Sequence, residues 1–271
     1  MDNNFLSIIT INYNNGIGLK KTIDSVKSQT SINYEHIIID GNSSDESINI
    51  LKDALYDANY EKHVTFWCSE KDKGVYDAMN KGIQHANGKF CLFLNSGDYL
   101  ADNKSIQRLE TYDLTDDSII YTNAIYFNKK NEWKVVFPEK LTPFFFYQRK
   151  TLSHQNMLFP TQYIKNNPYS LEYKVASDVD LYLKAFFVDN LRFIHLNEII
   201  SKYENETGIS SQAGSLLLNQ EWDIQLKKYI PEMYRDLLSD YYIYENNYHG
   251  LLRKIKHLLQ SYTRIKKRIK K

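Results

Sequence analysis

Short apolar runs alternate with amphipathic stretches over the first hundred residues of the chain. Continuous apolar runs bounded by turn residues predict buried strands, and apolar positions at helical spacing predict helices. The predicted strands are residues 7–11, 35–39, 64–68 and 90–94, and the predicted helices are residues 19–29, 45–58 and 75–86. This alternation favours βαβ units and a mostly parallel sheet that helices cover on both faces.

The pattern is less regular after this part. Residues 118–127 and 133–137 predict a β-hairpin, and residues 156–159 and 191–200 predict further strands with a helix at 178–188 between them. From residue 215 onward the pattern is helical. We therefore predict one α/β domain over residues 1–214 and a helical C-terminal extension over residues 215–271.

Composition places the chain among ordinary globular proteins. Its 271 residues are 42% apolar and 25% charged, which excludes a disordered, collagen-like or disulfide-stapled chain. Cys68 and Cys91 match no metal-ligand spacing, so we expect free thiols in a reducing compartment. The start of the chain lacks a basic n-region, and no apolar stretch approaches the roughly 18 residues that span a bilayer. We expect no signal peptide and a cytoplasmic protein.

The net charge of +1 hides an asymmetry. Nine basic residues and no acidic one follow Leu251, which leaves 25 basic against 33 acidic residues, a charge of about −8, for the rest. A mildly acidic body argues against a nucleic-acid binder. The tail carries apolar residues at helical spacing between its charges, so it predicts a basic amphipathic helix on an anionic membrane surface. The alternative is a helix that packs its apolar stripe on the domain.

Polar clusters follow three of the predicted strands, at residues 12–15, 40–45 and 95–98. Each cluster alone has the composition of a turn. Ligands of α/β sheets bind outside the carboxyl ends of the strands, and three such clusters at one sheet edge favour a binding site over mere turns.

Four acidic residues are the candidates for chemistry at that edge. Asp98, beside Gly97, suits a magnesium or manganese ion bound to a diphosphate, because such ions take one or two protein carboxylates. Asp40 suits an N–H donor of a nucleotide base, or it orders its own turn. Asp45 suits a helix N-cap better than a ligand. Asp178, at a helix start, is either a cap or a general base.

Other residues near these clusters have less defined roles. Asp72 follows the third strand, where a ribose or phosphate contact is expected, and Asp180 points to a different helix face from Asp178. Asn80 and Gly82 are poor helix formers within a predicted helix, which indicates close packing or a polar contact. We expect His154 and the following glutamine to help to shape the pocket, and the alternative for His154 is a purely structural role. Phosphate-loop, dinucleotide, zinc-protease and nucleophile-elbow motifs are absent from the sequence.

The chain resembles family 2 glycosyltransferases of the GT-A fold, and is most similar to their bacterial O-antigen, capsule and colanic-acid branch. The resemblance rests on four ordered segments, and it is strong over residues 5–100, moderate to about residue 215 and absent beyond. The segments are residues 7–14, 37–47, 69–82 and 93–98, with further matches at residues 154–155, 177–178 and 208–211.

The resemblance implies a nucleotide-diphosphate-sugar donor, usually a UDP-sugar, with Thr10, Asn12 and Asp40 around the nucleoside. Asp98 matches the last acid of the family's DxD motif and would bind Mn²⁺ or Mg²⁺. Asn95 stands where many members carry the first acid. We therefore expect the donor to be bound by these residues together with those of the third segment, namely Thr10, Asn12, Asp40, Asp72, Asn80 and Asn95.

Asp178 matches the base of the family's Glu-Asp pair, with Ser177 in place of the first acid. The resemblance therefore implies an inverting transfer to a hydroxyl of a lipid-linked oligosaccharide, at the inner face of the membrane. One alternative is a sugar-nucleotide nucleotidyltransferase, which needs a Gly-rich phosphate loop that residues 12–15 do not supply. A non-catalytic membrane-associated scaffold with the same fold is the other alternative. The enzyme hypothesis requires Asp40, Asp98 and Asp178 to converge around one cavity.

Overall fold

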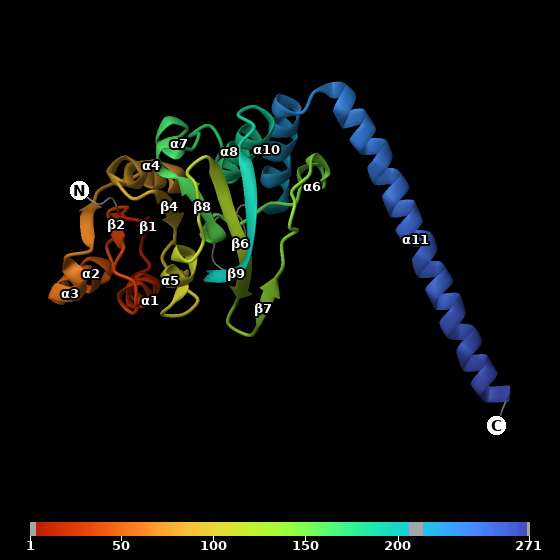
Figure 1. Ribbon diagram of the computed structural model, residues 1–271, viewed down its shortest axis with the longest axis horizontal. Coiled ribbons are helices and arrows are strands. Elements are labelled where there is room, and N and C mark those ends of the chain that lie inside the picture. Colours follow the sequence, from red (N-terminus) through yellow and green to blue (C-terminus); the bar gives the residue numbers. More distant parts are fainter. Residues whose placement is uncertain (1–3, 206–213, 270–271) are drawn as a thin grey trace.

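A single mixed sheet carries the strands of the protein (Figure 1). The computed structural model describes residues 4–205 and 214–269, with side chains described over residues 4–205 and 216–250. The strands are β1 (Leu6–Asn12), β2 (Tyr34–Asp40), β3 (Val64–Ser69), β4 (Phe90–Phe93), β5 (Tyr99–Leu100), β6 (Ser118–Phe127), β7 (Glu132–Val135), β8 (Met157–Pro160) and β9 (Arg192–Glu204). The segment 208–211, one of the family matches, lies outside the described residues.

Helices connect the strands and cover both faces of the sheet. They are α1 (Gly16–Lys27), α2 (Ser47–Leu55), α3 (Ala58–Glu61), α4 (Val75–His85), α5 (Ser105–Glu110), α6 (Pro143–Tyr147), α7 (Thr161–Asn166), α8 (Ser177–Phe187), α10 (Gly214–Tyr229), α11 (Glu232–Ile269) and the 3₁₀ turn η1 (His154–Asn156). The predicted α/β class is confirmed.

The strand order is β3-β2-β1-β4-β8-β6-β9-β5, with β7 paired to β6. The first four strands are parallel, as the alternating pattern predicts. Beyond β4 the sheet is mixed, because β8 lies antiparallel to both β4 and β6 while β6 and β9 are parallel. The parallel half places the ends of β1, β2, β3 and β4 at one edge of the sheet.

Side chains alternate between two apolar layers along β1. Ile9 and Ile11 join the layer that also contains Met79 of α4 and residues of α8, whereas Leu6 and Ile8 join the layer beneath α1, α2 and α5. Figure 1 shows α4, α7 and α8 on one side of the sheet and α1, α3 and α5 on the other. Burial on both faces explains why β1 and β2 read as continuous apolar runs.

The helix starts after β1 and β2 differ from the prediction by two or three residues. Helix α1 begins at Gly16, earlier than expected, because the Asn15 side chain caps it by accepting from the Gly18 N–H at 3.1 Å. The Asp45 carboxylate accepts the N–H groups of Gly16 at 2.9 Å and Ser47 at 3.1 Å. It therefore stabilises two helix starts, which is the structural role that the sequence favours.

Helix α10 packs on the domain. Trp222 and Leu226 of α10, and Ile230 directly after it, are buried in the apolar layer that contains α8. The division of the chain at residue 214 stays a prediction. Helix α11 leaves the body of the protein (Figure 1). No helix within the described residues combines the length and apolarity that crossing a bilayer requires.

Candidate functional site

Three loops meet at the carboxyl edge of the parallel strands. The Asn15 side-chain amide donates to the Ser96 carbonyl at 2.8 Å, and the Ser96 N–H donates to the Ile11 carbonyl at 3.0 Å. These bonds hold the loop after β1 against the loop after β4. The Asn14 N–H donates to the Ser43 hydroxyl at 2.8 Å, which ties the loop after β2 to the same edge. The three polar clusters therefore form one continuous surface, as the sheet topology requires.

Asp40 is enclosed by its own loop. Its Oδ1 accepts from Asn12 Nδ2 at 2.7 Å and from the Ser43 hydroxyl at 2.6 Å, while its Oδ2 accepts from the Ser43 N–H at 2.9 Å and the Ser69 hydroxyl at 2.6 Å. Burial acts to raise the pKa of Asp40, but these hydrogen bonds outweigh it and hold the pKa below its ordinary value. The carboxylate is fully buried, and its hydrogen bonds order the turn, the alternative role in the sequence analysis. A contact of Asp40 with a nucleotide base stays a prediction.

Two further residues that we expect to bind the sugar donor form hydrogen bonds with other residues of the protein. Thr10 is fully buried, and its hydroxyl shares a 2.8 Å hydrogen bond with the His36 ring. Asn80 donates to the Tyr169 carbonyl at 2.8 Å and accepts from the Tyr169 N–H at 2.9 Å. Thr10 therefore belongs to the core, and Asn80 holds the segment before α8 against α4. That they also contact the donor stays a prediction.

Asn12 and Asp72 lie where β1 and β3 end. The Asn12 Oδ1 is buried, and no described residue donates a hydrogen bond to it. Asp72 lies beside Gly41, where an added Cβ would approach its Oδ2 to 2.9 Å, and it pairs with Lys81 at 2.6 Å. Burial raises the pKa of Asp72, although Lys81 opposes the rise. Tyr13, with 69% of its surface exposed, lies at the same turn.

Asp98 sits beneath the loop after β4. Gly97 has a φ of +110°, which only glycine adopts readily, and this turn directs the chain inward. The Asp98 carboxylate is almost fully buried and accepts from Gln155 Nε2 and from the Glu204 N–H, both at 2.9 Å. Burial raises the pKa of Asp98 to about 6, although these two hydrogen bonds oppose the rise.

Asp178 faces the same edge from the start of α8. Its Oδ1 accepts from the Val179 N–H at 2.9 Å and from the Tyr76 hydroxyl at 3.3 Å. Burial and the nearby Asp178 charge raise the pKa of Tyr76, so this phenol keeps its proton. The other oxygen, Oδ2, lies 3.8 Å from His154 Nδ1, and His154 Nε2 lies 3.2 Å from Asn95 Nδ2. A chain of contacts thus joins Asp178 to the loop that carries Asp98.

The turn η1 connects the two acidic residues. His154 lies beside Asp178, and the adjacent Gln155 binds Asp98. Asp40 lies two strands from this pair and faces its own loop. That all three carboxylates line one cavity stays a prediction. Asp180 does point to another face of α8, where it pairs with Lys228 of α10 at 2.9 Å.

The donor set around Asp98 fits a hard divalent cation. Asn95 Oδ1 is buried and receives no hydrogen bond from a described residue, so an amide oxygen is available close to the Asp98 loop. No cluster of three or more His, Cys, Asp or Glu side chains with metal-binding geometry occurs among the described residues. Magnesium and manganese ions bound to a diphosphate take one or two carboxylates from the protein, and phosphate oxygens and water complete their shell.

Some contacts of the site carry no signal in the sequence. The Glu204 backbone N–H binds Asp98 from the end of β9, more than a hundred residues away, and any residue type supplies an N–H. Ser43, Ser69 and Tyr76 do lie in the second and third family-like segments, and those segments are the signal that points to them.

Comparisons with known proteins agree with this architecture. A relative named UDP-Glc:alpha-D-GlcNAc-diphosphoundecaprenol beta-1,3-glucosyltransferase WfgD, from Escherichia coli, is 28% identical over 230 residues, covering 83% of this chain and 86% of its own. The structure of S. aureus TarS 1-349 in complex with UDP-GlcNAc matches with a TM-score of 0.64 at 18% identity, over 86% of this chain and 70% of that chain.

A second solved structure is the mannosyltransferase PcManGT from Pyrobaculum calidifontis in complex with GDP-Man and Mn²⁺. It matches with a TM-score of 0.60 at 13% identity, over 87% of this chain and 68% of that chain. The family model described as glycosyl transferase family 2 matches residues 7–166, more than half of the chain. The chain therefore belongs to glycosyl transferase family 2 and is a glycosyltransferase of the GT-A fold.

Proposed function

We propose that the protein transfers a sugar from a UDP-sugar to a hydroxyl of a lipid-linked oligosaccharide in the assembly of a bacterial surface polysaccharide, with inversion at the anomeric carbon. The observation that carries the proposal is the contact of Asp178 with His154, beside the loop that holds Asp98. The family match ends at residue 166, so the role of Asp178 rests on this geometry.

Asp178 is the proposed general base. Its Oδ1 is held by the Tyr76 hydroxyl and the Val179 N–H, which fixes the direction of the carboxylate. No described residue donates a hydrogen bond to Oδ2, so this oxygen can accept the proton of an acceptor hydroxyl. The hydroxyl oxygen bonds to the anomeric carbon as the bond from that carbon to the diphosphate breaks, and the proton passes to Asp178.

The donor would bind along the carboxyl edge of the parallel strands. The unpaired Asn12 Oδ1 and the exposed ring of Tyr13 lie at the turn beside Asp40, where they offer an acceptor and a stacking surface to a nucleoside. Asp72 offers a carboxylate to a ribose hydroxyl at the same turn. Asp40 supports this surface from below by ordering the loop that Ser43 belongs to.

Asp98 and Asn95 would hold the diphosphate end of the donor through Mn²⁺ or Mg²⁺. Such an ion offsets the negative charge that develops on a departing nucleoside diphosphate. The Asp98 carboxylate is oriented by Gln155 and the Glu204 N–H before any ligand arrives, which lowers the entropy cost of binding. His154, between Asn95 and Asp178, sets the spacing between donor and base.

A lipid-linked acceptor is proposed because WfgD, which covers most of this chain, is named for a diphosphoundecaprenol acceptor and a UDP-glucose donor. The basic tail supports it, since nine basic residues without an acidic one attract anionic headgroups at the inner face of a membrane. Because the chain is a glycosyltransferase, the nucleotidyltransferase alternative falls away. A scaffold that has lost catalysis would release no nucleoside diphosphate.

The test is the substitution Asp178→Asn, which keeps the shape of the side chain and removes the base. We expect turnover to fall by at least about 10², while the donor dissociation constant changes little. Glu172→Gln is the control, because Glu172 is an exposed residue whose backbone N–H donates to the Ser170 hydroxyl of its own loop. Release of nucleoside diphosphate from UDP-, GDP- and dTDP-sugars, with and without Mn²⁺, gives the readout. Near-normal turnover of Asp178→Asn would remove Asp178 from this role.

A further inference from the structure

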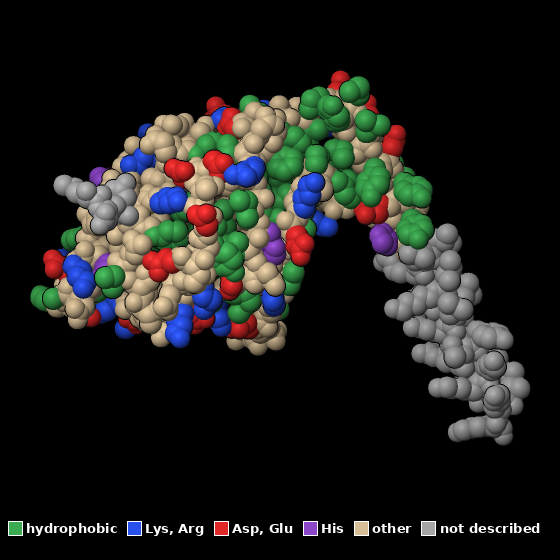
Figure 2. Space-filling view, in the orientation of Figure 1, with side chains coloured by type: hydrophobic (Ala, Val, Ile, Leu, Met, Phe, Trp, Pro, Cys, Tyr) green, Lys and Arg blue, Asp and Glu red, His purple; other side chains and the backbone are tan. Residues whose placement is uncertain are grey.

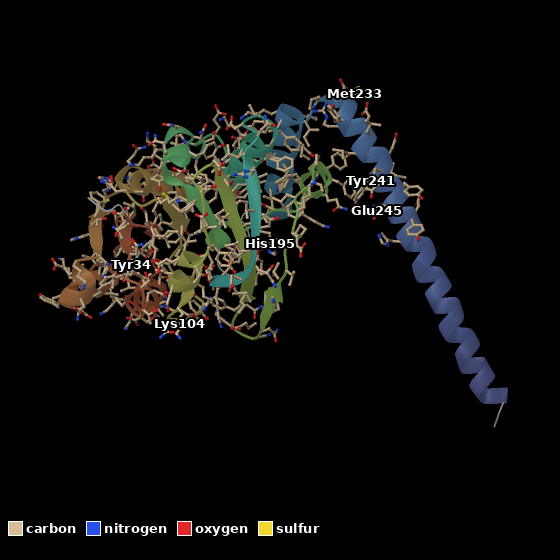
Figure 3. All side chains as sticks on the ribbon, in the orientation of Figure 1. Tyr34, Lys104, His195, Met233, Tyr241 and Glu245 are labelled. Carbon is tan, nitrogen blue, oxygen red and sulfur yellow. The ribbon has the colours of Figure 1, made fainter. Side chains whose placement is uncertain are left out.

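The first half of α11 carries an uncovered apolar stripe. Tyr234, Leu237, Tyr241, Tyr244 and Tyr248 have exposed fractions between 50% and 68%. Figure 2 shows hydrophobic side chains gathered over this part of the helix, and Figure 3 places Met233, Tyr241 and Glu245 along it. Tyr241 touches Phe144 of α6 at a ring distance of 4.7 Å and still leaves half of its surface exposed. A stripe of this size on a projecting helix calls for a partner.

The stripe follows a strict seven-residue repeat. Its positions alternate three and four residues apart, and the sequence continues the same register to the end of the helix. The a positions are Tyr234, Tyr241, Tyr248, Ile255, Tyr262 and Ile269, and the d positions are Leu237, Tyr244, Leu251, Leu258 and Ile265. Every a and d position over five heptads is apolar, which is the pattern of a coiled coil.

The length of the repeat decides between a helical partner and a flat surface. A straight α-helix has 3.6 residues per turn, so a stripe with a period of 3.5 drifts by about 20° per heptad. Over five heptads the drift reaches about 100°, which turns one end of the stripe away from a flat membrane. A supercoiled helical partner follows the stripe along its whole length of about 57 Å.

The charges of α11 indicate which helix this partner is. Residues 232–250 hold four carboxylates against one arginine, whereas residues 251–271 hold nine basic residues and no acidic one. Two copies of α11 that run in opposite directions place each acidic half beside a basic half. Two parallel copies place the basic halves side by side, which like-charge repulsion disfavours.

We propose that α11 pairs with the α11 of a second copy of this chain as an antiparallel coiled coil. The pairing buries the a and d positions, and those at residues 234–248 have half or more of their surface exposed in the single chain. Four of the seven basic residues at 251–269 fall at positions b, c and f of the repeat, on the outside of such a coil. Electrostatic attraction to anionic lipid therefore remains compatible with the pairing, whereas insertion of the apolar stripe into lipid does not.

The mass of the full chain in lipid-free solution tests the pairing. Light scattering on a sizing column should give twice the 32.0 kDa mass of one chain. The variant Tyr244→Glu with Leu258→Glu charges two d positions and should give the mass of one chain. Its control, Asn246→Glu with Gln260→Glu, adds the same charges at two f positions and should keep the double mass. Nucleotide binding and thermal unfolding of the domain check that each variant is folded.

Cross-linking tests the direction, in a Cys68→Ser background. A chain with Leu237→Cys should form a disulfide with a chain that carries Tyr262→Cys or Ile269→Cys, and should not form one with itself. A Leu237→Cys homodimer would overturn the antiparallel arrangement. A single-chain mass for the unsubstituted protein, or equal masses for the d and f variants, would overturn the pairing. If the protein has the mass of one chain and the d variant no longer sediments with anionic vesicles, the stripe binds lipid instead.

Discussion

Asp98 is expected to reduce the stability of the ligand-free protein. Its carboxylate is almost fully buried, and burial raises its pKa from 3.8 to about 6. Between these values the folded protein binds more protons at this site than the unfolded chain, so the free energy of unfolding falls as pH rises through the window and stays low above it. A difference of about two pKa units corresponds to roughly 3 kcal/mol.

The substitution Asp98→Asn removes this cost. The asparagine Oδ1 can accept from the Glu204 N–H, and its amide can donate to Gln155 once the Gln155 amide rotates. We expect the variant to exceed the original protein in unfolding free energy by up to about 3 kcal/mol at pH 8, and by less than about 1 kcal/mol at pH 4. Denaturant unfolding at both pH values measures the difference.

Asp40→Asn is the matched control with the opposite sign. The pKa of Asp40 is lowered by hydrogen bonds that outweigh burial, so its ionised form stabilises the fold above the ordinary carboxyl pKa. Asp40→Asn should therefore reduce stability at pH 8 and reduce it less at low pH.

A second measurement tests Asp98→Asn through ligand binding. Adding Mn²⁺ with UDP should shift the unfolding temperature of the original protein and should leave that of Asp98→Asn unchanged. A stability gap for Asp98→Asn that does not change between pH 4 and pH 8 would refute the reasoning.

Two further predictions concern the C-terminal helices. Glu221→Ala removes the carboxylate that accepts the N–H groups of residues 174–176 at 2.8–3.1 Å. Because buried N–H groups are left unpaired, the free energy of unfolding in denaturant should fall by about 3 kcal/mol or more. The control Asp223→Ala breaks an exposed pair with Arg149 and should cost less than about 1 kcal/mol, so equal losses would contradict this prediction. Removing residues 251–271 should reduce sedimentation with anionic vesicles but not with neutral ones, and unchanged pelleting would rule out the tail as the contact.

The periodicity of the sequence determined the elements of the domain. The first four strands and the helices between them lie within a few residues of the predicted ranges, because burial on both faces leaves a continuous apolar run and burial on one face leaves a helical period. The polar clusters at the carboxyl ends followed from this topology. Asp98 and Asp178 were identified from the type of residue and its place in the resemblance, and the structure links them through η1.

Tertiary structure decided which hydrogen-bond partners the polar side chains of the site have. The Thr10 hydroxyl shares a hydrogen bond with His36, and the Asp40 carboxylate accepts from Ser43 and Ser69. Ser43 belongs to the loop that follows Asp40, but His36 and Ser69 come from neighbouring strands, and a local sequence pattern does not record which hydroxyl reaches which carboxylate. The same holds for α10, whose helical pattern is ordinary and whose place in the core depends on the surface that α8 offers. Periods of apolar residues encode elements locally, whereas hydrogen-bond partners depend on how distant elements meet.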